Sequence, residues 1–133
     1  MISVKDLFAG YAGNPGITPE HEANAEALLE NVNDLLLWAV EEGWRPQKNP
    51  ATGTYVSGQT DGGWRPQDCA TGAPNSAHKQ GKAVDVFDRS GELDAIITDE
   101  MLENFGLFRE APSATSSWCH LQDRPTKKRT FQP

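Results

Sequence analysis

Three side chains in two separated segments of the sequence could together bind a metal ion. His78 and Asp85 both lie in the segment Ser76–Val86, and His120 lies in the later run Trp118–Gln122. Imidazole nitrogens and carboxylate oxygens are zinc ligands, and two histidines with one carboxylate leave a coordination position open for water. Such a ligand set is typical of a catalytic rather than a structural zinc site.

The sequence between His78 and Asp85 favours a chain reversal that would bring the two side chains together. Gly81 can adopt a positive φ without steric cost, and Lys82–Asp88 has the β-branched and aromatic content of a strand. An aspartate buried in such a strand is costly unless it is paired, and a metal ion would pair with it. The spacing alone also fits a surface histidine and a separately satisfied carboxylate. The presence of His120 favours the metal site.

The segment around these residues resembles the signature of a known enzyme family. The agreement lies in the string Ser76-x-His78-x-x-Gly81-x-Ala83-x-Asp85. The family is that of the zinc D-alanyl-D-alanine carboxypeptidases, which includes several bacteriophage endolysins and shares its fold with the hedgehog signalling domain. Two preceding segments, Gly-Trp-Arg-Pro at residues 63–66 and Gly-Ala-Pro-Asn at residues 72–75, add to the resemblance. It extends over about half the chain, from Tyr55 to Gln122.

The resemblance implies that a zinc ion is bound by His78, Asp85 and His120. It also implies that Arg65 binds the carboxylate of a peptide substrate, and it assigns Ser76 to substrate binding. A planar guanidinium suits the first role because it can donate two parallel hydrogen bonds to a carboxylate. The alternative for Arg65 is an ordinary surface position.

The same resemblance implies an activity. We expect a zinc metallopeptidase that hydrolyses stem-peptide bonds of bacterial peptidoglycan, with peptidoglycan or another D-amino-acid-containing peptide as its partner. The first residues lack a basic segment followed by an apolar run, so we predict no secretory signal. We expect a monomer of phage or prophage origin, made in the bacterial host cytoplasm and acting at the cell wall or on the virion.

The general base of the expected reaction is not at its usual place. Enzymes of this family usually carry an acid a few residues before the second histidine, often three, but here Ser117 is three before His120 and Ala114 is six before it. The nearest carboxylates are Glu110 and Asp123. We rank Glu110 first, because it ends a predicted strand and starts a loop that returns to the site. Asp123 would point away from His120 on a regular strand. Both acids could instead be solvated surface groups.

The missing acid leaves a second function open. The chain could be a catalytically degenerate zinc-binding domain that recognises the cell wall or a virion partner. In a third interpretation the protein is a structural domain in which His78 and His120 do not meet.

The elements that must position these residues can be predicted from local patterns. An amphipathic helix is predicted from Thr18 to Glu42, with Thr18 as N-cap and Pro19 in the first position. His21 in its first turn is expected to be exposed and not a ligand. The helix places an apolar residue every three or four positions, as expected for a buried stripe: Ala25, Leu28, Leu29, Val32, Leu35, Leu36 and Ala39.

Short strands and helices follow. Strands are predicted at residues 54–57, 82–88, 107–109 and 118–122, and helices at 92–97 and 99–104. This order indicates an α+β domain with a mainly antiparallel sheet and helices packed on one face. The resemblance implies a hedgehog/DD-peptidase-like version of that fold.

Length and composition restrict the classes of function. A chain of 133 residues is sufficient for one domain, residues 1–133. A net charge of −7 argues against nucleic-acid binding, and the basic run Lys127–Arg129 is predicted to be a solvated tail. No stretch reaches the roughly 18 apolar residues of a membrane span. Cys69 and Cys119 are expected to be reduced thiols, with one disulfide between them as the alternative.

Overall fold

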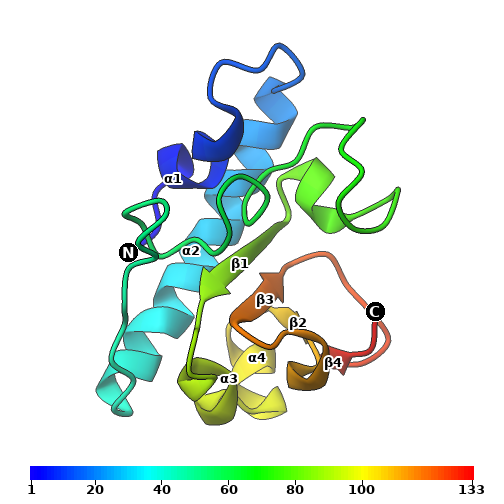
Figure 1. The fold of residues 1–133 in the computed structure, drawn as a ribbon. Coiled ribbons are helices and arrows are strands. Elements are labelled where there is room, and N and C mark those ends of the chain that lie inside the picture. The colour runs from blue at the N-terminus through cyan, green and yellow to red at the C-terminus, as the bar shows by residue number, and fades with distance from the viewer.

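The computed structural model describes residues 1–133 as a set of helices packed against one small sheet (Figure 1). Its helices and strands are, in chain order, α1 (Val4–Phe8), α2 (Pro19–Glu41), β1 (Ala83–Phe87), α3 (Glu92–Ile96), α4 (Asp99–Asn104), β2 (Phe108–Glu110), β3 (Trp118–Gln122) and β4 (Thr130–Phe131). Three short 3-10 helices complete the set: η1 (Ala9–Tyr11), η2 (Ala77–Gln80) and η3 (Pro112–Ala114).

The long helix α2 begins and packs as its sequence predicts. The Thr18 hydroxyl accepts a hydrogen bond from the backbone N–H of His21 at 3.1 Å, and the backbone N–H of Thr18 donates to His21 Nδ1 at 3.2 Å. All seven apolar residues of the predicted stripe are buried. The expectation that His21 is exposed is wrong: its ring is half-buried, 5.5 Å from that of Trp64, because it closes this cap.

The sheet has the strand order β1-β3-β2-β4 and is mixed. β3 is antiparallel to both β1 and β2, as expected, but β4 runs parallel to β2. The α+β class is therefore confirmed, with a parallel edge pairing that the sequence did not predict. β4 contains only two residues, too few to show a strand pattern.

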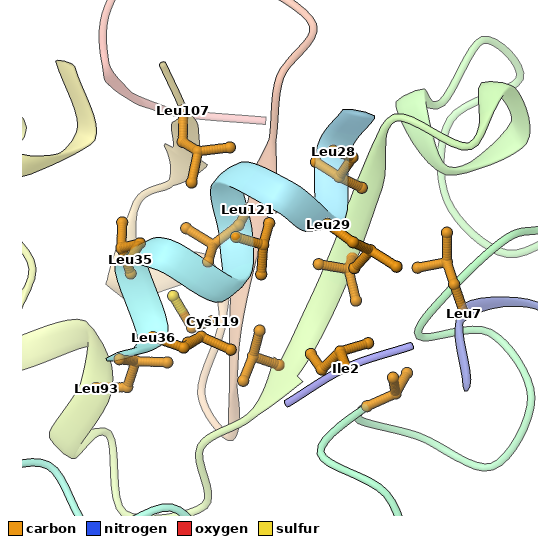
Figure 2. Packing of buried hydrophobic residues seen from close by; sticks show 14 of the residues in the cluster. Ile2, Leu7, Leu28, Leu29, Leu35, Leu36, Leu93, Leu107, Cys119 and Leu121 are labelled. Carbon is orange, nitrogen blue, oxygen red and sulfur yellow. The ribbon is translucent and has the colours of Figure 1, made fainter. Parts of the chain in front are cut away.

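The two faces of the sheet have different roles. Val84 and Val86 of β1 and Cys119 and Leu121 of β3 are buried in one cluster with the apolar stripe of α2, and α3 and α4 add to this cluster. Figure 1 shows α2 passing behind β1, and Figure 2 shows leucines of α2 packed against Cys119 and Leu121. Because side chains alternate along a strand, the residues between these apolar positions, Asp85 and His120, point to the opposite face.

Two predicted segments differ from the structure. The strand expected at residues 54–57 is only an isolated bridge between Val56 and Val86, because the chain turns away at Gly58, which has a φ of 77°. The basic run is not a free tail throughout, since the Arg129 guanidinium lies 4.2 Å from the centre of the Phe108 ring. No helix combines the length and the apolar character needed to cross a membrane.

Candidate metal centre

Pairing of β1 with β3 brings two of the predicted ligands together. Asp85 lies directly opposite His120 in this antiparallel pair, so both side chains occupy the same face. His78 approaches from η2, which immediately precedes β1. One ligand atom from each of the three residues lies within 4.8 Å of the other two. The predicted convergence of His78, Asp85 and His120 is therefore confirmed.

The turn between His78 and β1 depends on one glycine. Ser76 caps η2, its hydroxyl accepting a hydrogen bond from the backbone N–H of His78 at 3.2 Å. Gly81 ends η2 with a φ of 75°, as predicted, and a Cβ atom there would lie 2.7 Å from the backbone oxygen of His21. Only glycine combines this conformation with this approach to α2, and the result is that the chain enters β1 with His78 facing Asp85.

A backbone carbonyl determines which nitrogen of His78 faces the centre. His78 Nδ1 lies 2.8 Å from the carbonyl oxygen of Gly63. A carbonyl oxygen can only accept, so Nδ1 carries the proton and donates. The other nitrogen, Nε2, lies 3.3 Å from Asp85 Oδ1. His78 therefore presents Nε2 to the centre.

His120 is held the other way round. Its Nε2 lies 2.7 Å from Gln122 Oε1, and its Nδ1 lies 3.0 Å from Asp85 Oδ1. Gln122 Oε1 is an acceptor, so Nε2 donates to it and Nδ1 faces the centre. The two histidines thus direct different nitrogens at one carboxylate oxygen.

The inner nitrogens of His78 and His120 both face the carboxylate of Asp85, so positive charge is needed between these three groups. With both outer nitrogens donating, the inner nitrogens of His78 and His120 either carry extra protons or direct lone pairs at Asp85. All three residues are buried, with exposed fractions of 2%, 4% and 7% for His78, His120 and Asp85. A divalent cation would replace both protons and satisfy all three ligand atoms. The buried group could therefore hold a metal ion.

The charges in the site perturb its acid–base equilibria. Burial raises the pKa of Asp85, but the two imidazoles beside it outweigh this effect and hold that pKa well below its usual value. Burial lowers the pKa of His120, but the hydrogen bond and the charge of Asp85 outweigh it and raise the pKa. In the absence of a metal, the site therefore favours an ionised carboxylate beside protonated imidazole.

Arg65 lies beside the carboxylate ligand and is not an ordinary surface residue. Its Nη2 lies 3.5 Å from Asp85 Oδ2, and its Nε and Nη1 donate to the backbone oxygens of Asp61 at 2.7 Å and Thr71 at 3.3 Å. A Cβ atom at Gly72 would lie 2.6 Å from Arg65 Nη1, so this glycine leaves the room that the guanidinium needs. Three of the five N–H donors of Arg65 are used within the chain.

The two candidate acids have different positions. Glu110, at the end of β2, places Oε1 3.9 Å from His120 Nδ1, and its side chain is 24% exposed. Asp123 lies beyond β3, is not a member of the three-ligand group, and has one buried carboxylate oxygen without a hydrogen-bond partner. Glu110 is therefore the acid that lies next to the site. Ser117 precedes β3 and supplies no carboxylate.

The three ligands open into a cleft of about 460 Å³. Its walls include Arg65, Ser76 and Glu110, together with Trp118, Arg124 and Phe131. Phe131 comes from β4, and its ring centre lies 6.0 Å from that of His120. No role in the site was predicted for Trp118, Arg124 or Phe131. Phe131 reaches it through the pairing of β4 with β2, which no local sequence pattern indicates.

Neither cysteine takes part in the site. Cys119 is free and buried in the core on the opposite face of β3, where burial and the charge of Asp94 raise its pKa. Cys69 is also free and lies near the Tyr11 hydroxyl, with Sγ 3.8 Å from Oη. A cysteine nucleophile needs a lowered pKa, so the geometry does not support a thiol mechanism at Cys119.

Comparisons of the chain with family models, with curated proteins and with solved structures find no match. What the site can do is therefore inferred from the chemistry of its own side chains.

Proposed function

We propose that this protein is a zinc metallopeptidase that hydrolyses peptide bonds in the stem peptides of bacterial peptidoglycan. The observation that carries the proposal is the convergence of His78, Asp85 and His120 in a cleft that also contains Glu110 and Arg65. The resemblance of the Ser76–Asp85 string to zinc D-alanyl-D-alanine carboxypeptidases supports this class of substrate, and the endolysins of that family support action at the cell wall or on a virion.

The ligand chemistry fits zinc. Two imidazoles and one carboxylate are the protein ligands of many catalytic zinc sites, with the remaining position open. A hard ion such as magnesium or calcium prefers oxygen ligands throughout, whereas two of the three residues in this ligand group are histidines. When bound, zinc would supply Lewis acidity, polarising the scissile carbonyl and making water nucleophilic near neutral pH.

Glu110 is proposed as the general base. Its carboxylate lies beside the ligands and partly open to the cleft, where a water molecule attacking the scissile carbonyl would be positioned. The carboxylate would accept a proton from this water and then donate it to the leaving amine.

Arg65 is proposed to anchor a carboxylate of the substrate. Two of its N–H donors have no partner within the chain, since three of five are used. Stem peptides carry free carboxylates, which a guanidinium binds well. Ser76 lies on the same wall of the cleft, but its hydroxyl already caps η2, so any contact with the substrate would be additional to this structural role.

The proposal is tested by digestion of purified sacculi. Zinc-loaded protein should release soluble muropeptides and new amino groups, and His78→Ala should release none. Mass spectrometry of the products would identify the bond that is cleaved. If the zinc-loaded protein releases no product above the His78→Ala background, the peptidase is excluded for this substrate.

Ser117 favours a second candidate function, because it stands where enzymes of the resembling family carry an acid. In that case the protein would be a zinc-binding domain that recognises the cell wall or a virion partner without cleaving it. It would co-sediment with sacculi in a zinc-dependent manner, and the sacculi would remain intact.

A further inference from the structure

We propose that Gln122 is a positioning residue that holds the His120 ring with its proton on Nε2, so that Nδ1 is available to the metal. This inference rests on the proposed metal site. Gln122 is the last residue of β3 and has an exposed fraction of 3%. It is on the same strand face as His120, because residues two apart on a strand share a face.

The direction of each hydrogen bond follows from a single fixed acceptor. Gln122 Nε2 donates to the backbone oxygen of Arg124 at 2.7 Å. Because that oxygen can only accept, the amide nitrogen of Gln122 must face it, and Oε1 must face His120. The 2.7 Å contact between Oε1 and His120 Nε2 then requires a proton on Nε2.

Arg124 also forms hydrogen bonds with the segment that carries His78. Its Nη1 donates to the backbone oxygen of Asn75 at 2.9 Å and lies 3.2 Å from Gln80 Oε1. Asn75 lies just before η2 and Gln80 ends it, and η2 carries His78. These hydrogen bonds connect the end of β3 to the segment around η2.

The two histidines differ in how they can be tested. The proton on His78 Nδ1 is held by the backbone oxygen of Gly63, which no side-chain substitution removes. The proton on His120 Nε2 is held by a side chain, so its acceptor can be deleted or replaced. Such partners of metal-binding histidines fix ring orientation and raise ligand basicity, and removing one typically costs roughly 10- to 100-fold in metal affinity.

Two variants of Gln122 separate positioning from simple packing. Gln122→Met keeps the length of the side chain but removes the acceptor. Gln122→Glu keeps an acceptor for His120 Nε2 and loses only the donor to the Arg124 carbonyl. Gln59→Met, at an exposed position, is the matched control. Zinc dissociation constants are measured by competition with a chromophoric chelator. The ring N–H proton of His120 is followed by NMR, because a buried, hydrogen-bonded N–H exchanges slowly with water.

We expect Gln122→Met to bind zinc roughly 10- to 100-fold more weakly and to lose the slowly exchanging ring N–H signal. Gln122→Glu should keep the ring N–H signal and bind zinc more tightly than Gln122→Met, because it still accepts the His120 proton, and Gln59→Met should change neither property. If Gln122→Met binds zinc with wild-type affinity, the role proposed for Gln122 is wrong but the metal site stands. The same conclusion follows if the wild-type protein binds zinc and both Gln122 variants bind it equally weakly. Absence of zinc binding by the wild-type protein would overturn the metal site itself.

Discussion

Glu110 and His120 are neighbours on adjacent strands, with Glu110 Oε1 3.9 Å from His120 Nδ1. The register of β2 and β3 explains this contact. Arg109 pairs with Leu121 in an antiparallel arrangement, so the next residue of β2 lies level with the preceding residue of β3. The acid beside the metal ligands thus comes from a neighbouring strand, although position 117, three residues before the histidine, is a serine.

The first prediction concerns metal content. We expect about one zinc ion per chain in protein prepared without chelators, because three ligands converge in a buried site. His78→Ala and His120→Ala should each lose most of the zinc, as measured by inductively coupled plasma mass spectrometry. His21→Ala is the matched control, because His21 is outside the ligand group, and it should keep its zinc. Equal zinc content in all of these proteins would contradict the assignment.

The second prediction concerns Glu110. Glu110→Gln should retain zinc but hydrolyse stem peptides roughly 10²- to 10⁴-fold more slowly, because the amide cannot accept the proton. The exposed acid Glu103 on α4 provides the control variant Glu103→Gln, which should have wild-type rates. Unchanged hydrolysis by Glu110→Gln would remove this residue from the mechanism. A large loss would exclude the non-catalytic alternative.

The third prediction concerns pH and the metal-free protein. The lowered pKa of Asp85 contributes stability above its usual value of 3.8, and this contribution is lost as the pH falls. The raised pKa of His120 contributes stability below its usual value of 6.5, and this is lost as the pH rises through the folded-state pKa. The site should therefore stabilise the metal-free protein most between about pH 4 and 6.5.

Zinc should stabilise the protein most at alkaline pH, where the metal-free protein loses the contribution of His120. The reason is that zinc binding requires deprotonated imidazoles. The increase in the thermal unfolding midpoint on adding zinc should be small at pH 5 and larger at pH 8. Unfolding curves across this range, with and without zinc, provide the measurement. A zinc effect that is constant with pH would show that the histidines are not its ligands.

The fourth prediction concerns Gly63, whose backbone oxygen accepts the His78 proton. A Cβ atom at this position would lie 2.0 Å from the backbone oxygen of Leu7, so Gly63→Ala must move the backbone. We expect a loss of about 1–3 kcal/mol in the free energy of unfolding, together with weaker zinc binding. Gly91→Ala is the comparison, because Gly91 has a φ of 75° with open space around it.

Gly91→Ala should lower the free energy of unfolding by a similar amount, about 1–2 kcal/mol, through backbone strain alone. Its zinc affinity should remain that of the wild-type protein, because Gly91 lies at the start of α3 and contacts no ligand residue. If Gly63→Ala also binds zinc normally, the Gly63 carbonyl does not orient His78.

The fifth prediction concerns Arg65. Arg65→Lys keeps the positive charge but loses the planar pair of donors, so the KM for stem peptides should rise roughly 10- to 100-fold. Because Arg65 also contacts Asp85, zinc content must be measured on the same preparation. A rise in KM at full zinc occupancy indicates substrate binding. Loss of zinc would instead indicate that the main role of Arg65 is to orient Asp85.

The sequence by itself determined the features that depend on local patterns. The stripe of α2 and its Thr18 cap follow from helical periodicity and side-chain chemistry, and both are present as predicted. The bounds of β3 also agree with the prediction. Residue types, the Gly81 turn and the resemblance of the Ser76–Asp85 string together selected His78, Asp85 and His120 as one group, and the three residues do converge.

Tertiary structure decided which of several equivalent residues reach the site. The phrase Gly-Trp-Arg-Pro-Gln occurs twice, yet Arg45 is exposed whereas Arg65 is buried beside Asp85. Glu110 and Asp123 were both candidates for the acid, and the β2–β3 register placed only Glu110 beside His120. Such outcomes depend on hydrogen bonds between segments far apart in the chain, and a local pattern carries no information about its distant partner.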